Sequence, residues 1–137
     1  MKRIVKPERM RDMMNAMKKM PTHCGDDTCS ACVVAGDFIF LAHHAGGFDQ
    51  NDVKHQTRAA FERMKDTLAK VGATLNDMAQ INLYLKNLED FREARDVFYE
   101  YFKEGGFPAR MTTQTKFIDG NCLCMIDGVA YKPRQAQ

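Results

Sequence analysis

The sequence predicts a two-layer α+β fold, in which two main helices pack on one face of a single mixed β-sheet. A length of 137 residues and a 45% apolar content suit one globular domain with a substantial core. Short apolar runs typical of strands alternate with two long helical patterns, in the order strand, strand, helix, strand, helix, strand, strand. Because two helices cover only one sheet face, we expect an oligomer to bury the other.

Residues 1–20 precede this pattern and are predicted to form an appended amphipathic helix with a basic outer face. Four methionines recur at the i, i+3, i+4, i+7 spacing of one helical face: Met10, Met13, Met14 and Met17. Pro21 helps to end the segment, and residues 21–137 are predicted to form a single domain. The methionine stripe suits packing on the same protein, on a neighbouring subunit, on RNA or in a partner's groove.

The first half of the domain is predicted to contain a hairpin, a long helix and a strand. Residues 32–35 and 38–42 flank a Gly36-Asp37 turn, as in a β-hairpin. Residues 51–71 carry an apolar stripe at helical spacing, made of Val53, Thr57, Ala60, Phe61, Met64, Leu68 and Val71. Gly72 ends this helix, and residues 78–85 show the period of two that is typical of a strand.

The second half is predicted to contain a helix and two strands. Asn87, with Asp90 three residues on, is a candidate N-cap for this helix. Its apolar seam consists of Phe91, Ala94, Phe98 and Phe102, and Gly105-Gly106 ends it. Residues 111–117 alternate in the polarity of their side chains, and residues 122–131 are mostly apolar, so both segments are predicted to be strands.

The charge of the chain argues against two classes of partner. Twenty basic and 18 acidic residues leave a net charge of +2, which disfavours a basic nucleic-acid binder or a polybasic membrane protein. No apolar run approaches the length of a membrane span, and the first residues lack the apolar region of a secretory signal. We therefore expect a cytoplasmic protein with no membrane partner.

Five cysteines make a disulfide framework a poor interpretation, because the number is odd. Cys29 and Cys32 have the two-residue gap of a zinc knuckle, and His23 and Cys24 lie upstream, but a second tight pair is missing. A redox dithiol is the other alternative. Buried or incidental thiols fit the pattern better, so we predict no metal and no cofactor.

The stretch Phe107-Pro108-Ala109-Arg110 ends a Gly-Gly loop and opens a predicted strand. An arginine there offers a planar fork of donors to a carboxylate or phosphate. With this stretch, the chain over residues 30–131 resembles the Rid (reactive intermediate deaminase; YjgF-like, endoribonuclease L-PSP-like) family. The other segments that carry the resemblance are residues 36–45, His55-Gln56-Thr57, Val71-Gly72-Ala73, residues 78–85, Asn87-Leu88-Glu89-Asp90-Phe91 and Tyr101-Phe102.

The resemblance implies a chorismate-mutase-like homotrimer with ligand clefts between subunits. It also implies that Arg110 holds the carboxylate of a 2-imino acid, and that the protein hydrolyses enamines and imines to 2-oxo acids and ammonia. Such chemistry needs an oriented carboxylate, one water and a group that moves a proton. Two alternatives stay open: a small-carboxylate-binding or regulatory protein without turnover, and an endoribonuclease that uses the basic segment and two histidines.

The chain departs from the family pattern within the implied site. Thr112 stands where the resemblance implies cysteine, and Met125 stands where it implies a water-positioning glutamate. Asp127 shares a face with Met125 in a regular strand, but replacing that glutamate would need a shift of register. Arg95 and Phe98 occupy the usual asparagine and tyrosine positions.

His43 and His44 are candidates for the missing acid and base, because imidazole titrates near neutrality. Neighbours on a strand point to opposite faces, so at most one of them faces the cleft. The alternative places one on the surface and the other in a hydrogen-bonded turn. We predict His43, His44 and Thr112 as catalytic residues. We predict Arg110, Arg95 and Met125 as substrate-binding residues.

Overall fold

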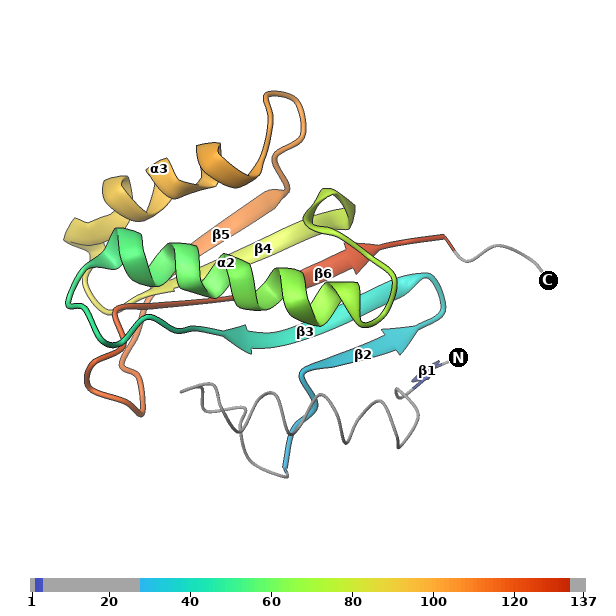
Figure 1. Ribbon diagram of the computed structural model, residues 1–137, viewed down its shortest axis with the longest axis horizontal. Coiled ribbons are helices and arrows are strands. Elements are labelled where there is room, and N and C mark those ends of the chain that lie inside the picture. Colours follow the sequence, from blue (N-terminus) through green and yellow to red (C-terminus); the bar gives the residue numbers. More distant parts are fainter. Residues whose placement is uncertain (1, 4–27, 134–137) are drawn as a thin grey trace.

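The computed structural model describes residues 2–3 and 28–133, which form one six-stranded sheet and two main helices, α2 (Val53–Ala69) and α3 (Phe91–Tyr101). Both helices lie on the same face of the sheet (Figure 1). The strands are β1 (Lys2–Arg3), β2 (Cys32–Ala35), β3 (Phe38–His44), β4 (Met78–Leu85), β5 (Ala109–Gln114) and β6 (Cys124–Tyr131). Their order is β1-β2-β3-β6-β4-β5, in which only β4 and β5 are parallel neighbours. The predicted two-layer α+β fold is confirmed.

The apolar stripe predicted for the first helix forms the contact of α2 with the core. All its side chains are buried, and Phe61 at its centre meets the rings of Phe98, Tyr101 and Phe102. The helix begins after Asp52, whose carboxylate accepts a hydrogen bond of 2.9 Å from the backbone N–H of Lys54. It ends at Ala69, and Gly72 redirects the chain with a positive φ of 79°.

Two strands have different ends from those predicted, because strand pairing sets where they begin and end. β5 occupies Ala109–Gln114 rather than residues 111–117, because its parallel ladder with β4 stops where β4 ends, at Leu85. β6 begins at Cys124 rather than at residue 122, again opposite Leu85. The extent of each strand is therefore set by its partner as well as by its own apolar pattern.

A 3₁₀ turn over Leu88–Asp90 precedes α3, so this helix begins at Phe91. The side chain of Asn87 makes no capping hydrogen bond, contrary to the prediction. Its backbone carbonyl instead accepts the N–H of Asp90 at 3.1 Å, which closes the 3₁₀ turn.

β3 continues two residues beyond the predicted end, to His44, and contains an irregular step. Leu41 lies opposite Gly128 and His44 lies opposite Ile126, so three steps along β3 match two steps along β6. Such a β-bulge changes the phase of the strand. Leu41 and His44 consequently share the helix-covered face, although they are three positions apart, an odd number that would put them on opposite faces of a regular strand.

The predicted helix within residues 1–20 falls on residues outside those described, apart from Lys2 and Arg3. These two residues form β1, which pairs with Ala35 and Val34 of β2. Among the described residues, no helix combines the length and the apolar character needed to span a bilayer.

The sheet face opposite α2 and α3 carries no helix from the described residues, and exposed aromatic rings lie on it. Phe38, Phe40 and Tyr131 are 45%, 47% and 45% exposed, and the Phe38 ring contacts both others. We call this surface the open face. An exposed apolar sheet face agrees with the expectation that oligomerisation covers it, and the homotrimer stays a prediction.

Candidate functional site

Arg110 lies near the start of β5, which is the edge strand of the sheet. Its guanidinium carbon is 5.2 Å from the ring centroids of both Phe91 and Phe98, which belong to α3. These cation–π contacts orient the guanidinium. None of the ion pairs found among the described residues involves Arg110, and its strand is exposed. Its fork of donors is therefore available to an anion from solvent.

Two other predicted residues lie near Arg110. Thr112 follows it by two residues on β5 and therefore points to the same face. Arg95 lies on α3, four residues after Phe91 and three before Phe98, so it shares the helix stripe of the two rings that hold Arg110. We call Arg95, Arg110 and Thr112 the guanidinium half-site.

A second group of polar side chains meets on the open face around Asp127 of β6. One Asp127 oxygen, Oδ2, lies 3.0 Å from His43 Nε2 and accepts a 3.0 Å hydrogen bond from the Tyr84 hydroxyl. The other, Oδ1, accepts a 2.7 Å hydrogen bond from the Asn82 amide. The rings of His43 and Tyr84 are 4.6 Å apart at their centroids. We call these four residues the imidazole half-site.

The electrostatics of the imidazole half-site keep Asp127 ionised at neutral pH. Partial burial raises the pKa of its carboxyl, but hydrogen bonds from His43, Asn82 and Tyr84 outweigh burial and lower the pKa overall. Burial and the Asp127 charge raise the pKa of Tyr84, which therefore keeps its proton. Because an ionised carboxylate only accepts hydrogen bonds, His43 Nε2 carries a hydrogen.

His44 points to the opposite face and belongs to the core, where it is 5% exposed. Its Nδ1 lies 2.6 Å from the carbonyl oxygen of Ala42, and its Nε2 lies 2.8 Å from the Thr67 hydroxyl on α2. Burial lowers the pKa of His44 to about 4, so the ring is neutral at pH 7. The two histidines thus point to opposite faces of the sheet, and His43 is the one on the open face; that this face forms a cleft stays a prediction. The position of His44 favours a structural role over the catalytic one predicted for it.

We expect His44 to make the protein sensitive to acid. The folded-state pKa of His44 is about 4, below the ordinary value of 6.5. Between pH 4 and pH 6.5, His44 is therefore protonated in the unfolded chain and neutral in the folded protein. The free energy of unfolding should therefore be highest above pH 6.5 and fall by about 3 kcal/mol as the pH approaches 4. Urea unfolding at pH 7 and pH 4.5 measures this loss.

His44→Gln should remove most of that pH dependence, because glutamine does not titrate. His55→Gln is the matched control, since His55 pairs with Asp49 on the surface, and it should retain the wild-type pH dependence. An equal loss of stability in wild type and in His44→Gln would contradict this role of His44.

The two half-sites lie on opposite faces of the sheet. Arg110 pairs with Ile81 of β4, whose side chain is fully buried on the helix-covered face. Asp127 pairs with the next residue of β4, Asn82, and so points to the open face. Strands β6 and β4 also separate β3 from β5. One copy of the chain therefore does not bring Arg110 and His43 into a single site.

The part of the chain that contains both half-sites matches a known family. Residues 28–132 match the family model described as Endoribonuclease L-PSP. A RutC family protein of Pyrococcus abyssi is 34% identical over 109 residues, which cover 75% of this chain and 85% of that protein. The chain belongs to the Rid family. The resemblance drawn from its sequence is confirmed.

Further Rid relatives agree in sequence and fold. A protein of Dermatophagoides farinae named 2-iminobutanoate/2-iminopropanoate deaminase is 29% identical over 106 residues, covering 73% of this chain and 82% of that protein. A solved structure from Streptococcus pyogenes, described as a member of the yjgF family, has a TM-score of 0.71 and 32% identity. It covers 77% of this chain and 88% of that chain.

Met125 fills an apolar position in this Rid chain. Its side chain is 3% exposed and packs in a small cluster on the open face, beside the imidazole half-site. The cluster consists of Ala45, Cys122 and Met125, with Phe48, Tyr84 and Phe117 packed against it. A thioether there supports the Tyr84 ring by packing and cannot carry a proton. The substrate-binding role predicted for Met125 stays a prediction.

Asp127, Asn82 and Tyr84 are site residues that sequence reasoning left out of its predicted set. β6 pairs regularly with β4 here, with Met125 opposite Tyr84 and Asp127 opposite Asn82, so Asp127 shares the open face with Met125, as predicted for a regular strand. The period of two along both strands was the signal that pointed to them. What the sequence lacked was the pairing of the two strands.

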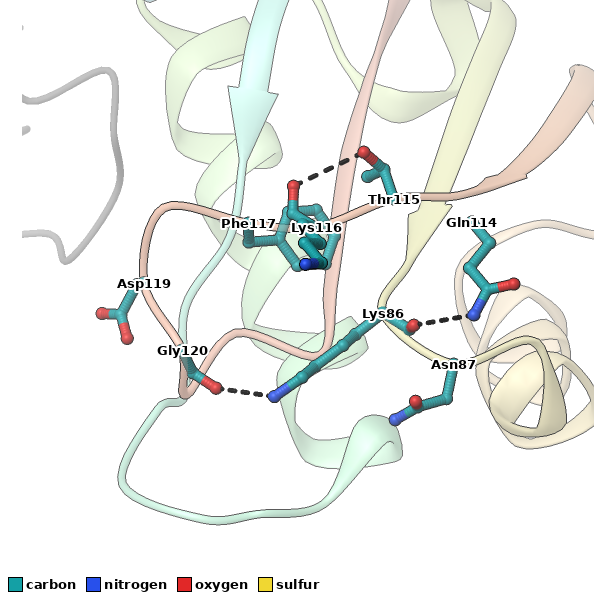
Figure 2. Close-up of a pocket in the computed structure, with 8 residues that line it drawn as sticks. All are labelled: Lys86, Asn87, Gln114, Thr115, Lys116, Phe117, Asp119 and Gly120. Atoms are coloured by element: carbon teal, nitrogen blue, oxygen red, sulfur yellow. Dashed lines mark hydrogen bonds between the residues drawn. The ribbon is translucent and has the colours of Figure 1, made fainter.

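A pocket of about 540 Å³ lies at the end of the parallel strands β4 and β5 (Figure 2). Figure 2 shows Lys86 reaching across it to donate to the Gly120 carbonyl at 2.9 Å, while the Gln114 amide donates to the Lys86 carbonyl at 3.2 Å. These contacts hold the loop after β5 against β4. None of the predicted site residues lines this pocket, and Arg110 lies about 13 Å from Gln114 along the strand.

Three of the four described cysteines are buried, and Cys29 is partly buried against the core. Burial raises the pKa of Cys32 to about 11, of Cys122 to about 12 and of Cys124 to about 11, so these thiols stay protonated at neutral pH. His23 and Cys24 lie outside the described residues. Within the described ranges no group of histidine, cysteine and carboxylate side chains is arranged to hold a metal, and the prediction of no metal or cofactor stays untested.

Proposed function

We propose that this Rid-family protein hydrolyses 2-imino acids and their enamine tautomers to 2-oxo acids and ammonium. The observation that carries the proposal is Arg110, held over two aromatic rings on an exposed edge strand with no carboxylate partner among the described residues. Such a guanidinium binds a carboxylate through two parallel hydrogen bonds. The name of the Dermatophagoides farinae relative, an iminobutanoate and iminopropanoate deaminase, supports the same reaction class.

The reaction suits a site with few catalytic groups. Water adds to C2 of the protonated imine, and the π electrons of the C=N bond move to nitrogen. A proton then passes from the new hydroxyl to the amine, the C–N bond breaks, and the 2-oxo acid and ammonium leave. The protein has to orient the carboxylate, hold one water and move a proton. The Thr112 hydroxyl, on the same face as Arg110, can donate to and accept from a water.

The imidazole half-site supplies the proton-transfer group in this proposal. Asp127 fixes the Nε2 hydrogen of His43 and orients the ring, while contact with the tilted Tyr84 ring limits its rotation. His43 Nδ1 then accepts a proton from water and returns it to the leaving amine. Tyr84 and Asn82 hold Asp127 ionised, which stabilises the imidazolium that forms in between.

A second copy of the chain is needed to assemble this site. The guanidinium and imidazole half-sites lie on opposite faces, and two strands separate His43 on β3 from Arg110 on β5, so one copy presents only half a cleft to each neighbour. In the proposed homotrimer, the guanidinium half-site of one subunit faces the imidazole half-site of the next. Each trimer then contains as many clefts as subunits, as expected for cyclic head-to-tail packing.

The decay of 2-iminopropanoate tests the proposal. The imine is generated in situ from alanine by an amino-acid oxidase, and its disappearance and the release of ammonium are followed with and without the protein. We expect decay well above the buffer rate. Decay of 2-iminopropanoate at the buffer rate would contradict the enzymatic proposal.

A carboxylate-binding protein without turnover is the second candidate, and the observation that favours it is Met125. This buried thioether occupies the position at which the family resemblance implies a glutamate. Calorimetric titration with 2-oxobutanoate separates the two functions. Binding with no imine hydrolysis would favour the second, and absence of binding would count against both.

A further inference from the structure

Arg95 places a second positive charge beside Arg110. With 100° per residue, Arg95 is turned about 40° from Phe91 and about 60° from Phe98 around the axis of α3. Along the axis it lies about 6 Å beyond Phe91 and about 4.5 Å before Phe98. The Arg110 guanidinium rests on these same two rings, at 5.2 Å from each. The two guanidinium groups therefore belong to one small surface.

The partners of Arg95 leave most of its hydrogen-bonding capacity unused. Its Nη2 donates to Asp96 Oδ1 at 3.2 Å, and this neighbour on the helix is 45% exposed, so the pair contributes little. Its Nε is buried and has no hydrogen-bond partner among the described residues. The side chain as a whole is 42% exposed, so the outer part of the guanidinium, rather than the buried Nε, is what a bound anion can meet.

Two like charges on one surface also repel each other until an anion lies between them. A single carboxylate at Arg110 satisfies one guanidinium and leaves the other uncompensated. A ligand with two carboxylates neutralises both. Among 2-imino acids, which derive from amino acids, those with an anionic side chain carry a second carboxylate.

We infer that the substrate class is the 2-imino dicarboxylates of four or five carbons, in which Arg110 holds the carboxylate next to the imine and Arg95 holds the distal one. The inference rests on the proposed function for the reaction and names the substrate class of the same site. It makes Arg95 a specificity-determining residue. A monocarboxylic imine would bind through Arg110 alone.

Calorimetry with 2-oxosuccinate and 2-oxopropanoate tests the inference without requiring turnover. We expect wild type to bind the dicarboxylate about 10- to 100-fold more tightly, since charge-assisted hydrogen bonds to a second carboxylate are gained. In Arg95→Gln the ratio of the two dissociation constants should fall to near one, and Arg95→Lys should restore part of it through charge alone. Arg92→Gln is the matched control, because Arg92 is an exposed arginine of the same helix, turned away from the ring stripe, and it should keep the wild-type ratio.

Hydrolysis of 2-iminosuccinate and 2-iminopropanoate, each generated in situ by an oxidase, extends the test to kcat/KM, where the same preference is expected. Equal affinity of wild type for both 2-oxo acids, or a preference that survives Arg95→Gln, would overturn the inference. A dicarboxylate preference in binding without any imine hydrolysis would remove the proposed function and leave the assignment of Arg95 standing. Hydrolysis of 2-iminopropanoate without a dicarboxylate preference would support the proposed function and remove the assignment of Arg95.

Discussion

Replacing Arg110 by alanine is expected to lower kcat/KM for imine hydrolysis by about 100- to 10,000-fold. The change removes two charge-assisted hydrogen bonds to the substrate carboxylate, each contributing about 1.5–3 kcal/mol, and with them the orientation of the imine carbon toward water. The fold should be retained, because Arg110 lies on an exposed edge strand and its guanidinium rests on the surface of the Phe91 and Phe98 rings. The initial rate of 2-oxo acid formation at low imine concentration measures the effect.

Two further variants separate the role of Arg110 from that of charge in general. Arg110→Lys keeps a cation but loses the planar fork, so its activity should lie between alanine and wild type. Arg92→Ala removes an exposed arginine of α3 outside the half-site and should leave kcat/KM unchanged. Wild-type activity in Arg110→Ala would exclude this guanidinium as the carboxylate anchor.

Replacing His43 by alanine is expected to lower kcat by about 100- to 10,000-fold, the usual contribution of a positioned acid and base. Asp127→Asn should give a smaller loss and change the pH profile, because the amide no longer stabilises an imidazolium at His43. Steady-state rates across pH 5–9 measure both effects. Full activity of His43→Ala would remove this histidine from the mechanism.

Mixing two inactive variants tests whether the half-sites come from different subunits. His43→Ala and Arg110→Ala are unfolded together in equal amounts and refolded, so that subunits assort at random. In a cleft shared by neighbours, about a quarter of the clefts receive both native half-sites, and about a quarter of the wild-type activity should return. If both half-sites acted within one chain, every site would keep one defect and no activity would return.

The elements were predictable from the chain because each depends on local pattern. The α2 stripe from Val53 to Val71 is buried as predicted, and the period of two in residues 78–85 gives β4 with the predicted bounds. The ends of β5 and β6 were less predictable, since both stop or start opposite Leu85 of β4. A strand end depends on its partner, which lies far away in sequence.

Within the candidate site, Arg110 was predictable because the Pro-Ala-Arg stretch, together with the other segments over residues 30–131, carries the family resemblance that implies its role. The roles of the two histidines were not, because the bulge in β3 and the pairing of β3 with β6 decide which of them meets Asp127. The same pairing makes Asp127 a partner of Asn82 and Tyr84, which their positions in the chain alone did not reveal.

From residue 32 onward, the sequence by itself determined the order of strands and helices and the buried side of each helix. All of these follow from spacing along one segment and from backbone geometry at that segment. Only the tertiary structure decided that His43 pairs with Asp127, that His44 is a neutral core residue and that the two half-sites lie on opposite faces. Each of these depends on the register between distant strands and on burial by α2, and a shift of one residue in register would reverse every face.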